Sequence, residues 1–174
     1  MRAIFTIGHS TRPIEEFTEL LGANGVEQLI DIRSVPRSRR NPQFNLDMLP
    51  DTLARAGIGY LHMPELGGLR HPHRDSPNGA WRNDSFRGYA DYMQTPEFAA
   101  AIEKLIELAK EKQTAIMCAE AVPWRCHRSL VGDALAARGI AVEDIIKGAR
   151  RQAHKLTPFA QVEGTRVWYP GLAG

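Results

Sequence analysis

The stretch of the sequence with the most reactive side chains is residues 114–130, TAIMCAEAVPWRCHRSL. It holds both cysteines of the chain, a carboxylate, a histidine and two arginines. Its pattern predicts an apolar strand through Cys118, a short polar loop, and a helix that begins near Cys126-His127-Arg128. Unpaired backbone N–H groups and the positive end of the helix dipole favour a thiolate or a bound anion at such a start. Cys126 is therefore the first candidate for a catalytic nucleophile.

The two cysteines have different surroundings. The functional interpretation of Cys126 is a thiolate stabilised by the positive charges of Arg125 and Arg128. The alternative is a small residue that fits a tight turn. Cys118 lies inside an apolar strand, which favours an inert core thiol. A redox-responsive pair of the two cysteines is a third interpretation, and it requires α-carbons within about 7 Å.

Glu120 and His9 are candidates for proton transfer. Glu120 is followed by Ala, Val, Pro and Trp, and desolvation there would suit it to general acid or base catalysis. The alternative is a carboxylate that pairs with a nearby arginine. His9 follows Gly8 at a strand exit, where it can carry a proton or cap the next helix.

A second chemical signal is the basic loop after the second predicted strand. It carries four arginines within eight positions and no acidic residue before Asp47, namely Arg33, Arg37, Arg39 and Arg40. Guanidinium groups bind phosphate or carboxylate through paired hydrogen bonds, so the loop predicts an anion site. The alternative is a solvated loop whose charges pair with acids elsewhere. Further candidates for anion or substrate binding are Ser10, Glu65, His127 and Arg128.

Residues 69–84, LRHPHRDSPNGAWRND, show neither the helical nor the strand period and predict a long surface loop. The loop interleaves arginines with Trp81, a pattern that single-stranded nucleic acid binding uses.

Spacing argues against two other kinds of site. A phosphatase-type loop needs an arginine six positions after its cysteine, but Trp124 follows Cys118 and Gly132 follows Cys126 at that distance. No pair of cysteines and histidines has the usual zinc-ligand spacing, so we expect no metal site. We also expect no cofactor.

The elements that must position these residues alternate between strand and helix. Apolar strands are predicted at residues 3–7, 26–32, 58–63, 115–119 and 140–146, with helices after the first, second and fourth and two helices between the third and fourth. This order predicts an α/β fold, with a mostly parallel sheet of about five strands and helices on both faces. In such sheets ligands bind beyond the carboxyl ends of the strands, which is where the candidate residues collect.

Length and composition predict a single domain of residues 1–174, with a core at about 3–146 and a C-terminal extension at 147–174. The extension contains a candidate hairpin that turns at Glu163-Gly164. The net charge of +2 does not indicate a protein coated by polyanions. Two cysteines and the lack of a long apolar run predict a cytoplasmic protein without a membrane partner. The oligomeric state is left open.

Several motifs together resemble a known family. They are Thr6-Ile7-Gly8-His9-Ser10, Asp31-Ile32-Arg33 with Pro36-Arg37-Ser38, Tyr60 with Pro64-Glu65-Leu66-Gly67-Gly68, Tyr89 with Tyr92-Met93, Met117-Cys118-Ala119-Glu120, and Cys126-His127-Arg128. On these motifs the chain is identified as a member of the domain-of-unknown-function 488 family, over about residues 5–146. The resemblance implies an α/β fold, and it names no activity.

These residues support two functional hypotheses. The first is an enzyme acting on a phosphate-bearing substrate, a nucleic acid or nucleotide, with arginines holding phosphate and Cys126, Glu120 and His9 doing the chemistry. The second is a module that binds a phosphate-bearing small molecule or nucleic acid in the same cleft without catalysis.

Overall fold

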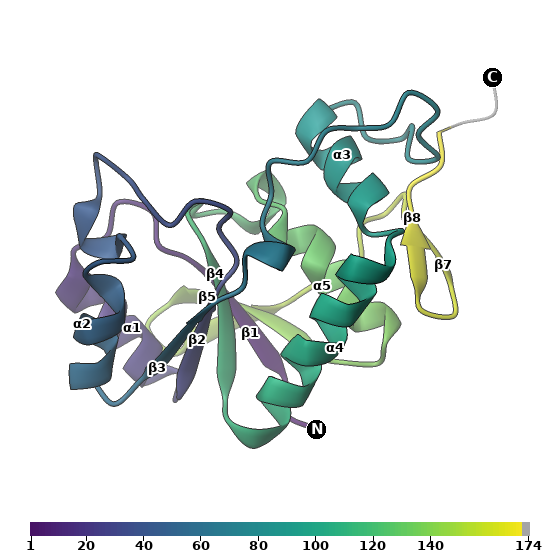
Figure 1. Ribbon diagram of the computed structural model, residues 1–174. Coiled ribbons are helices and arrows are strands. Elements are labelled where there is room, and N and C mark those ends of the chain that lie inside the picture. Colours follow the sequence, from purple (N-terminus) through teal and green to yellow (C-terminus); the bar gives the residue numbers. More distant parts are fainter. Residues whose placement is uncertain (172–174) are drawn as a thin grey trace.

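The computed structural model describes residues 1–171 and contains a six-stranded sheet in the order β3-β2-β4-β1-β5-β6 (Figure 1). The sheet strands are β1 (Ile4–Gly8), β2 (Gln28–Asp31), β3 (Gly59–His62), β4 (Thr114–Cys118), β5 (Val142–Lys147) and β6 (Arg150–Ala153). The first five are parallel, so the predicted α/β class and parallel sheet are confirmed. The antiparallel edge strand β6 was not predicted. All its residues are exposed, so it lacks the apolar pattern of a buried strand.

Helices cover both faces of the sheet (Figure 1). They are α1 (Ile14–Ala23), α2 (Leu49–Arg55), α3 (Asp84–Tyr92), α4 (Pro96–Glu111) and α5 (Arg128–Ala137). The apolar sides of α1 and α2 pack with Phe5 and Ile7 of β1 in one core cluster. Those of α3, α4 and α5 pack with Ile4 in another. Alternate residues of β1 thus point to opposite cores, as the period of two requires.

Local signals set most helix ends. The Thr95 hydroxyl caps α4 by accepting a hydrogen bond from the Phe98 amide at 3.3 Å, as its position predicts. The end of α1 is followed by Gly25, whose φ of +66° favours glycine. α5 begins at Arg128, within the three residues predicted for its start. A 3-10 turn at Pro123–Arg125 comes first, and Cys126 has an extended backbone.

The long loop is ordered by a buried carboxylate on α3. Asp91 accepts hydrogen bonds from the His73 amide at 2.7 Å, the Ser76 hydroxyl at 2.6 Å and the Asn78 amide group at 2.7 Å. Asn78 in turn accepts from the Tyr169 amide at 2.8 Å. The loop therefore packs against both α3 and the C-terminal extension.

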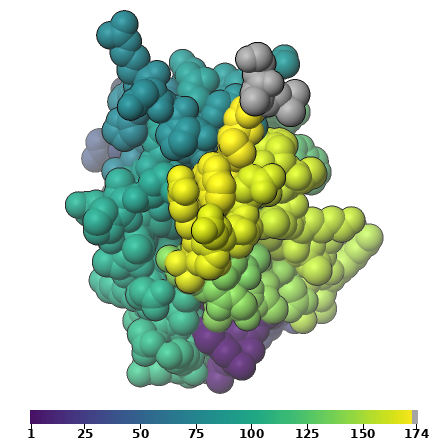
Figure 2. All heavy atoms as spheres, turned by 90° about the vertical axis from the view of Figure 1, so that its right-hand side faces the viewer, coloured from purple at the N-terminus to yellow at the C-terminus, as the bar shows by residue number. Residues whose placement is uncertain are grey.

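The extension contains the predicted hairpin, formed by β7 (Gln161–Glu163) and β8 (Arg166–Trp168). Figure 2 shows it in yellow, lying along the body of the molecule beside α4. Asp133 of α5 holds the extension, because its carboxylate accepts from the Tyr169 hydroxyl at 2.7 Å and pairs with His154 at 2.8 Å. Within residues 1–171, no helix has the length and apolar character needed to cross a membrane.

We predict that Gly8→Ala destabilises the fold. A Cβ on Gly8, at the end of β1, would overlap the Glu120 carbonyl and lie 2.7 Å from the Arg128 guanidinium. We expect a loss of about 1–3 kcal/mol in the free energy of unfolding, measured by urea denaturation. Gly22→Ala in α1 is the matched control, because its Cβ would meet nothing within 4 Å. That variant should gain about 0.5–1 kcal/mol. Equal effects of the two changes would contradict the prediction.

Candidate functional site

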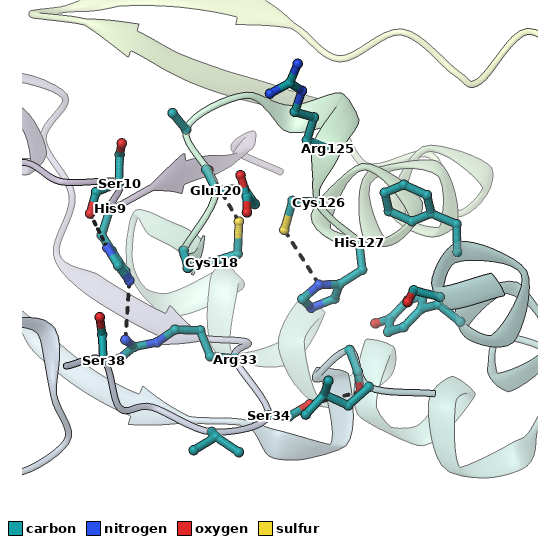
Figure 3. A pocket seen from close by; sticks show the side chains of 18 of the residues that line it. His9, Ser10, Arg33, Ser34, Ser38, Cys118, Glu120, Arg125, Cys126 and His127 are labelled. Carbon is teal, nitrogen blue, oxygen red and sulfur yellow. Dashed lines mark hydrogen bonds between the residues drawn. The ribbon is translucent and has the colours of Figure 1, made fainter. Parts of the chain in front are cut away.

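A cavity of about 960 Å³ lies at the carboxyl ends of the central strands (Figure 3). It is lined by residues that follow β1 and β2, by Gly68 and Leu69, by the N-terminal part of α3, and by Cys118 with the segment that joins β4 to α5. The predicted convergence of strand exits thus occurs in the structure. Seven predicted site residues line this pocket: His9, Ser10, Arg33, Arg37, Glu120, Cys126 and His127.

Beneath the pocket, Arg128 joins the end of β4 to the start of α5. Its side chain is 1% exposed. Nη1 lies 2.8 Å from the Cys118 sulfur and donates to the Glu120 carbonyl at 2.5 Å, while Nη2 donates to the Ala121 carbonyl at 3.1 Å. Among the described residues, no carboxylate pairs with this guanidinium. A buried cation needs an anion nearby, and Cys118 is the group in position to supply one.

The guanidinium that was expected to stabilise Cys126 lies against Cys118 instead, with Arg128 Nη1 2.8 Å from the Cys118 sulfur. Burial alone would raise the pKa of Cys118, but the neighbouring Cys126 and the charge of Arg128 lower it to about 7. Burial and the neighbouring Cys118 raise the pKa of Cys126 well above its ordinary value. The helix start contributes one donor, because the Arg128 amide at the beginning of α5 donates to the Cys126 sulfur at 3.4 Å, but this does not offset the effect of burial. Cys118, expected to be an inert core thiol, therefore carries the thiolate character.

His127 keeps Cys126 in its thiol form. Its Nε2 lies 2.9 Å from the Ile32 carbonyl, which can only accept, so Nε2 carries the ring proton. Burial lowers the pKa of His127 to about 4, which leaves the ring neutral at pH 7. Nδ1 is then an acceptor, 3.6 Å from the Cys126 sulfur. The thiol of Cys126 is thus placed to donate to this nitrogen.

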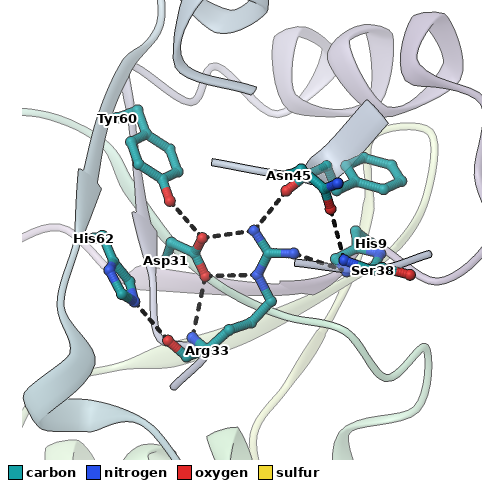
Figure 4. Close-up of polar contacts among 8 residues, drawn as sticks. His9, Asp31, Arg33, Ser38, Asn45, Tyr60 and His62 are labelled. Carbon is teal, nitrogen blue, oxygen red and sulfur yellow. Dashed lines mark hydrogen bonds and ion pairs between the residues drawn. The ribbon is translucent and has the colours of Figure 1, made fainter. Parts of the chain in front are cut away.

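A second buried group holds the other side of the pocket (Figure 4). Arg33 forms a two-pronged ion pair with Asp31, with Nε–Oδ1 at 2.9 Å and Nη2–Oδ2 at 2.7 Å. The Tyr60 hydroxyl donates to the same carboxylate at 2.5 Å. Arg33 Nη2 also donates to the Phe44 carbonyl at 2.7 Å. Arg33 is therefore neutralised within the protein, and it shapes the pocket wall rather than offering a free cation.

His9 is packed into this same network. Its Nδ1 donates to the Ser10 carbonyl at 2.7 Å, and its Nε2 faces Arg33 Nη1 at 3.4 Å. The ring stacks on Phe44 with centroids 4.3 Å apart. Burial lowers the pKa of His9 to about 4, and the Arg33 charge acts in the same direction. His9 is neutral with both ring nitrogens engaged, and it does not cap α1, which lacks a side-chain cap.

The remaining predicted residues divide between the pocket and other surfaces. Glu120 is exposed on the pocket lining, so the expected apolar surroundings do not enclose it. Neither of the exposed Arg39 and Arg40 lines the pocket. Glu65 lies outside it and faces Lys104 at 4.0 Å. Within residues 1–171, no group of three or more His, Cys, Asp or Glu side chains is arranged to hold a metal ion.

Sequence reasoning missed Asp31 and the apolar rim of the pocket. Asp31 and Arg33 stand two positions apart where the chain leaves β2, a spacing that puts side chains on one face of an extended chain and could have indicated their pairing. The rim includes three exposed residues, Val35 at 60%, Leu69 at 77% and Trp124 at 70%. Ser10 and Leu69 have positive φ values of 51° and 56°, and both line the pocket. Such backbone strain is common at functional sites.

The different pKa values of the two thiols predict different rates of alkylation. We expect iodoacetamide to modify Cys118 with an apparent pKa of about 7, because Arg128 stabilises its thiolate, while Cys126 reacts slowly. Peptide mass spectrometry after alkylation at several pH values measures both rates. Arg128→Lys, which cannot reproduce the forked contacts, should move the Cys118 profile to higher pH, whereas Arg125→Lys should leave it unchanged. Faster modification of Cys126 would overturn the assignment.

The neutral histidines predict a loss of stability in acid. Unfolded imidazoles take up protons near their ordinary pKa of 6.5, whereas folded His9 and His127 resist protonation until about pH 4. Acidification from pH 6.5 to 4 therefore favours the unfolded state, by on the order of 3 kcal/mol for each ring. Urea denaturation across this range should show a shallower pH slope for His9→Asn than for the wild type. His71→Asn, at an exposed loop position, is the control and should keep the wild-type slope.

Comparison with known proteins agrees with the motifs. A family model described as "Domain of unknown function DUF488" matches residues 13–135, from the residue before α1 to within α5. The matched region includes Arg33, Cys118, Cys126 and Arg128, and it omits His9 and the C-terminal extension. Searches of curated proteins and of solved structures found no match. Because the family model covers more than half of the sequence, this chain belongs to the DUF488 family.

Proposed function

We propose that the pocket binds a phosphate-bearing ligand, a nucleotide or a segment of nucleic acid, and that the protein is an enzyme acting on it. The observation that carries the proposal is a pair of exposed arginines, Arg37 and Arg125, on a pocket whose floor holds Cys118 and Cys126. Neither arginine forms an ion pair within the described part of the chain. Their guanidinium groups are free to bind phosphate oxygens.

The size and lining of the pocket favour a nucleotide over a smaller anion. A volume of about 960 Å³ is at the upper end of the range for small-molecule sites. Trp124 is 70% exposed on the lining and offers a ring face on which a base can stack. Phe86 lines the pocket as well. The pocket thus combines cations for a phosphate with aromatic surface for a base.

Within this proposal, Cys118 replaces Cys126 as the nucleophile. Arg128 stabilises the Cys118 thiolate, which attacks an electrophilic atom of the bound ligand, and the bond from that atom to its leaving group breaks. Glu120 is exposed on the pocket lining and can pass a proton from solvent to the leaving group. His9 is less suited to that role because both its ring nitrogens are engaged.

A non-catalytic binding module is the second candidate. The observation that favours it is the state of the histidines, which are neutral and hydrogen-bonded to backbone carbonyls, as suits structural groups. In that case the arginines and Trp124 hold the ligand, and the thiols serve only to pack the pocket floor.

Binding of a mixed-sequence single-stranded oligonucleotide and of nucleoside monophosphates tests both candidates, with tryptophan fluorescence as the readout. Affinity should fall as salt rises, because bound phosphates release counterions. Arg37→Ala and Arg125→Ala should each weaken binding about tenfold. Each should also reduce the slope of log affinity against log salt concentration by about one. Arg74→Ala, an exposed loop arginine off the pocket lining, is the matched control. An affinity that does not change with salt concentration would contradict the proposal that the pocket binds phosphate.

Product formation distinguishes the proposed enzyme from the non-catalytic binding module. Cys118→Ser should keep the oligonucleotide affinity within about twofold of the wild type, because the arginines and not the thiol hold the phosphate. The same variant should form no product, as detected by chromatography. If wild type and variant bind equally well and neither forms product from any of these ligands, the binding module is favoured.

A further inference from the structure

We propose that Cys118 and Cys126 are a dithiol site that exchanges with small disulfides, in which Cys118 attacks and Cys126 completes a reversible intramolecular disulfide. This activity goes beyond the proposed function and does not depend on a phosphate ligand. Both residues line the same cavity, and they are the two cysteines of the chain. Figure 3 shows both side chains in the pocket, with the Cys126 sulfur directed to the ring of His127.

Arg128 links the two sulfurs and gives them different roles. Its guanidinium Nη1 lies 2.8 Å from the Cys118 sulfur, and its backbone amide donates to the Cys126 sulfur at 3.4 Å. The Cys126 thiol is placed to donate to His127 Nδ1, 3.6 Å away. One sulfur therefore faces a fixed positive charge, and the other keeps its proton. An attacking thiolate with a protonated resolving thiol beside it is the arrangement that stepwise exchange requires.

The exchange balances in two steps. In the first step the Cys118 thiolate attacks one sulfur of a disulfide RSSR, a bond from Cys118 to that sulfur forms, the S–S bond of RSSR breaks, and one RS⁻ leaves. In the second step the Cys126 sulfur attacks the Cys118 sulfur, and the bond from Cys118 to the SR group breaks. The Cys126 proton passes to the departing sulfur, which leaves as RSH. Overall one thiolate and one thiol become a disulfide, and RSSR is reduced to RS⁻ and RSH.

Burial restricts the substrate to small disulfides. The two side chains are only 2% and 5% exposed, so a protein disulfide on a folded surface cannot reach them. The pocket of about 960 Å³ admits a compound such as oxidised glutathione or hydroxyethyl disulfide. Arg128 stabilises the reduced form, which makes the resulting disulfide more oxidising and therefore readily reversed.

Trypsin provides a direct readout, because cleavage after Arg125 separates the two cysteines. Cys118 falls in peptide 113–125 and Cys126 in peptide 126–128. The full-length protein is incubated with hydroxyethyl disulfide, treated with acid to stop exchange, alkylated and digested. We expect the two peptides to appear joined by a disulfide, and dithiothreitol to release them. Two free alkylated peptides, from protein whose circular dichroism is native, would overturn the proposal.

Single substitutions assign the order of attack. Cys126→Ser should trap a mixed disulfide on Cys118, and Cys118→Ser should slow mixed-disulfide formation on Cys126 at least about tenfold. The reverse pattern would overturn the assigned roles. Where a variant fails to fold, the wild-type protein can show which cysteine attacks. The rate of alkylation of each cysteine is then measured before and after oxidation. Oligonucleotide binding is measured separately, so a failure of either proposal leaves the other standing.

Discussion

The buried guanidinium of Arg128 is the constraint on which the pocket depends. Removing this charge from water is costly, so its donors must meet acceptors inside the fold. Nη1 and Nη2 meet the Cys118 sulfur and the carbonyls of Glu120 and Ala121, which fixes the path of the chain after β4. Nε is buried without a hydrogen-bond partner among the described residues. The contact with Cys118 sets the state of the thiols, because a cation at 2.8 Å favours the Cys118 thiolate. Gly8 makes the arrangement possible, since a side chain there would fill the space taken by the Glu120 carbonyl.

The arginines of the site fall into two groups, which differ in how deeply their side chains are buried. Arg33 and Arg128 are 7% and 1% exposed, and their hydrogen bonds are directed to the protein itself. Arg37 and Arg125 are exposed, line the pocket and have no carboxylate partner in the described residues. Buried guanidinium groups therefore build the walls and floor, while the charges of the exposed ones are not neutralised by these contacts. Two of the four arginines in the basic loop, Arg39 and Arg40, do not line the pocket.

The C-terminal extension supports the rim although it lies outside the matched family region. The match ends at residue 135, yet Tyr169 donates its hydroxyl to Asp133 of α5 and its amide to Asn78 of the long loop. Asp91 fixes the same loop from α3. The loop thus has anchors at two points, and Leu69 at its start and Phe86 just after its end line the pocket. The described part of the extension contacts the loop and does not line the pocket itself.

The sequence by itself determined the α/β class, the five parallel strands and the hairpin, because apolar periodicity and glycine or proline signals act over a few residues. It also placed His9, Arg33, Cys118 and Cys126 at strand exits. It could not show which of the two thiols has the lower pKa. The pKa of Cys118 depends on the guanidinium of Arg128, ten positions away in the sequence, which folding brings to 2.8 Å from the Cys118 sulfur. The sequence did not indicate the 3-10 turn at Pro123–Arg125 before the helix or the extended backbone of Cys126. Burial and partner identity are long-range properties, so the tertiary structure alone decided which charges are neutralised and which remain free.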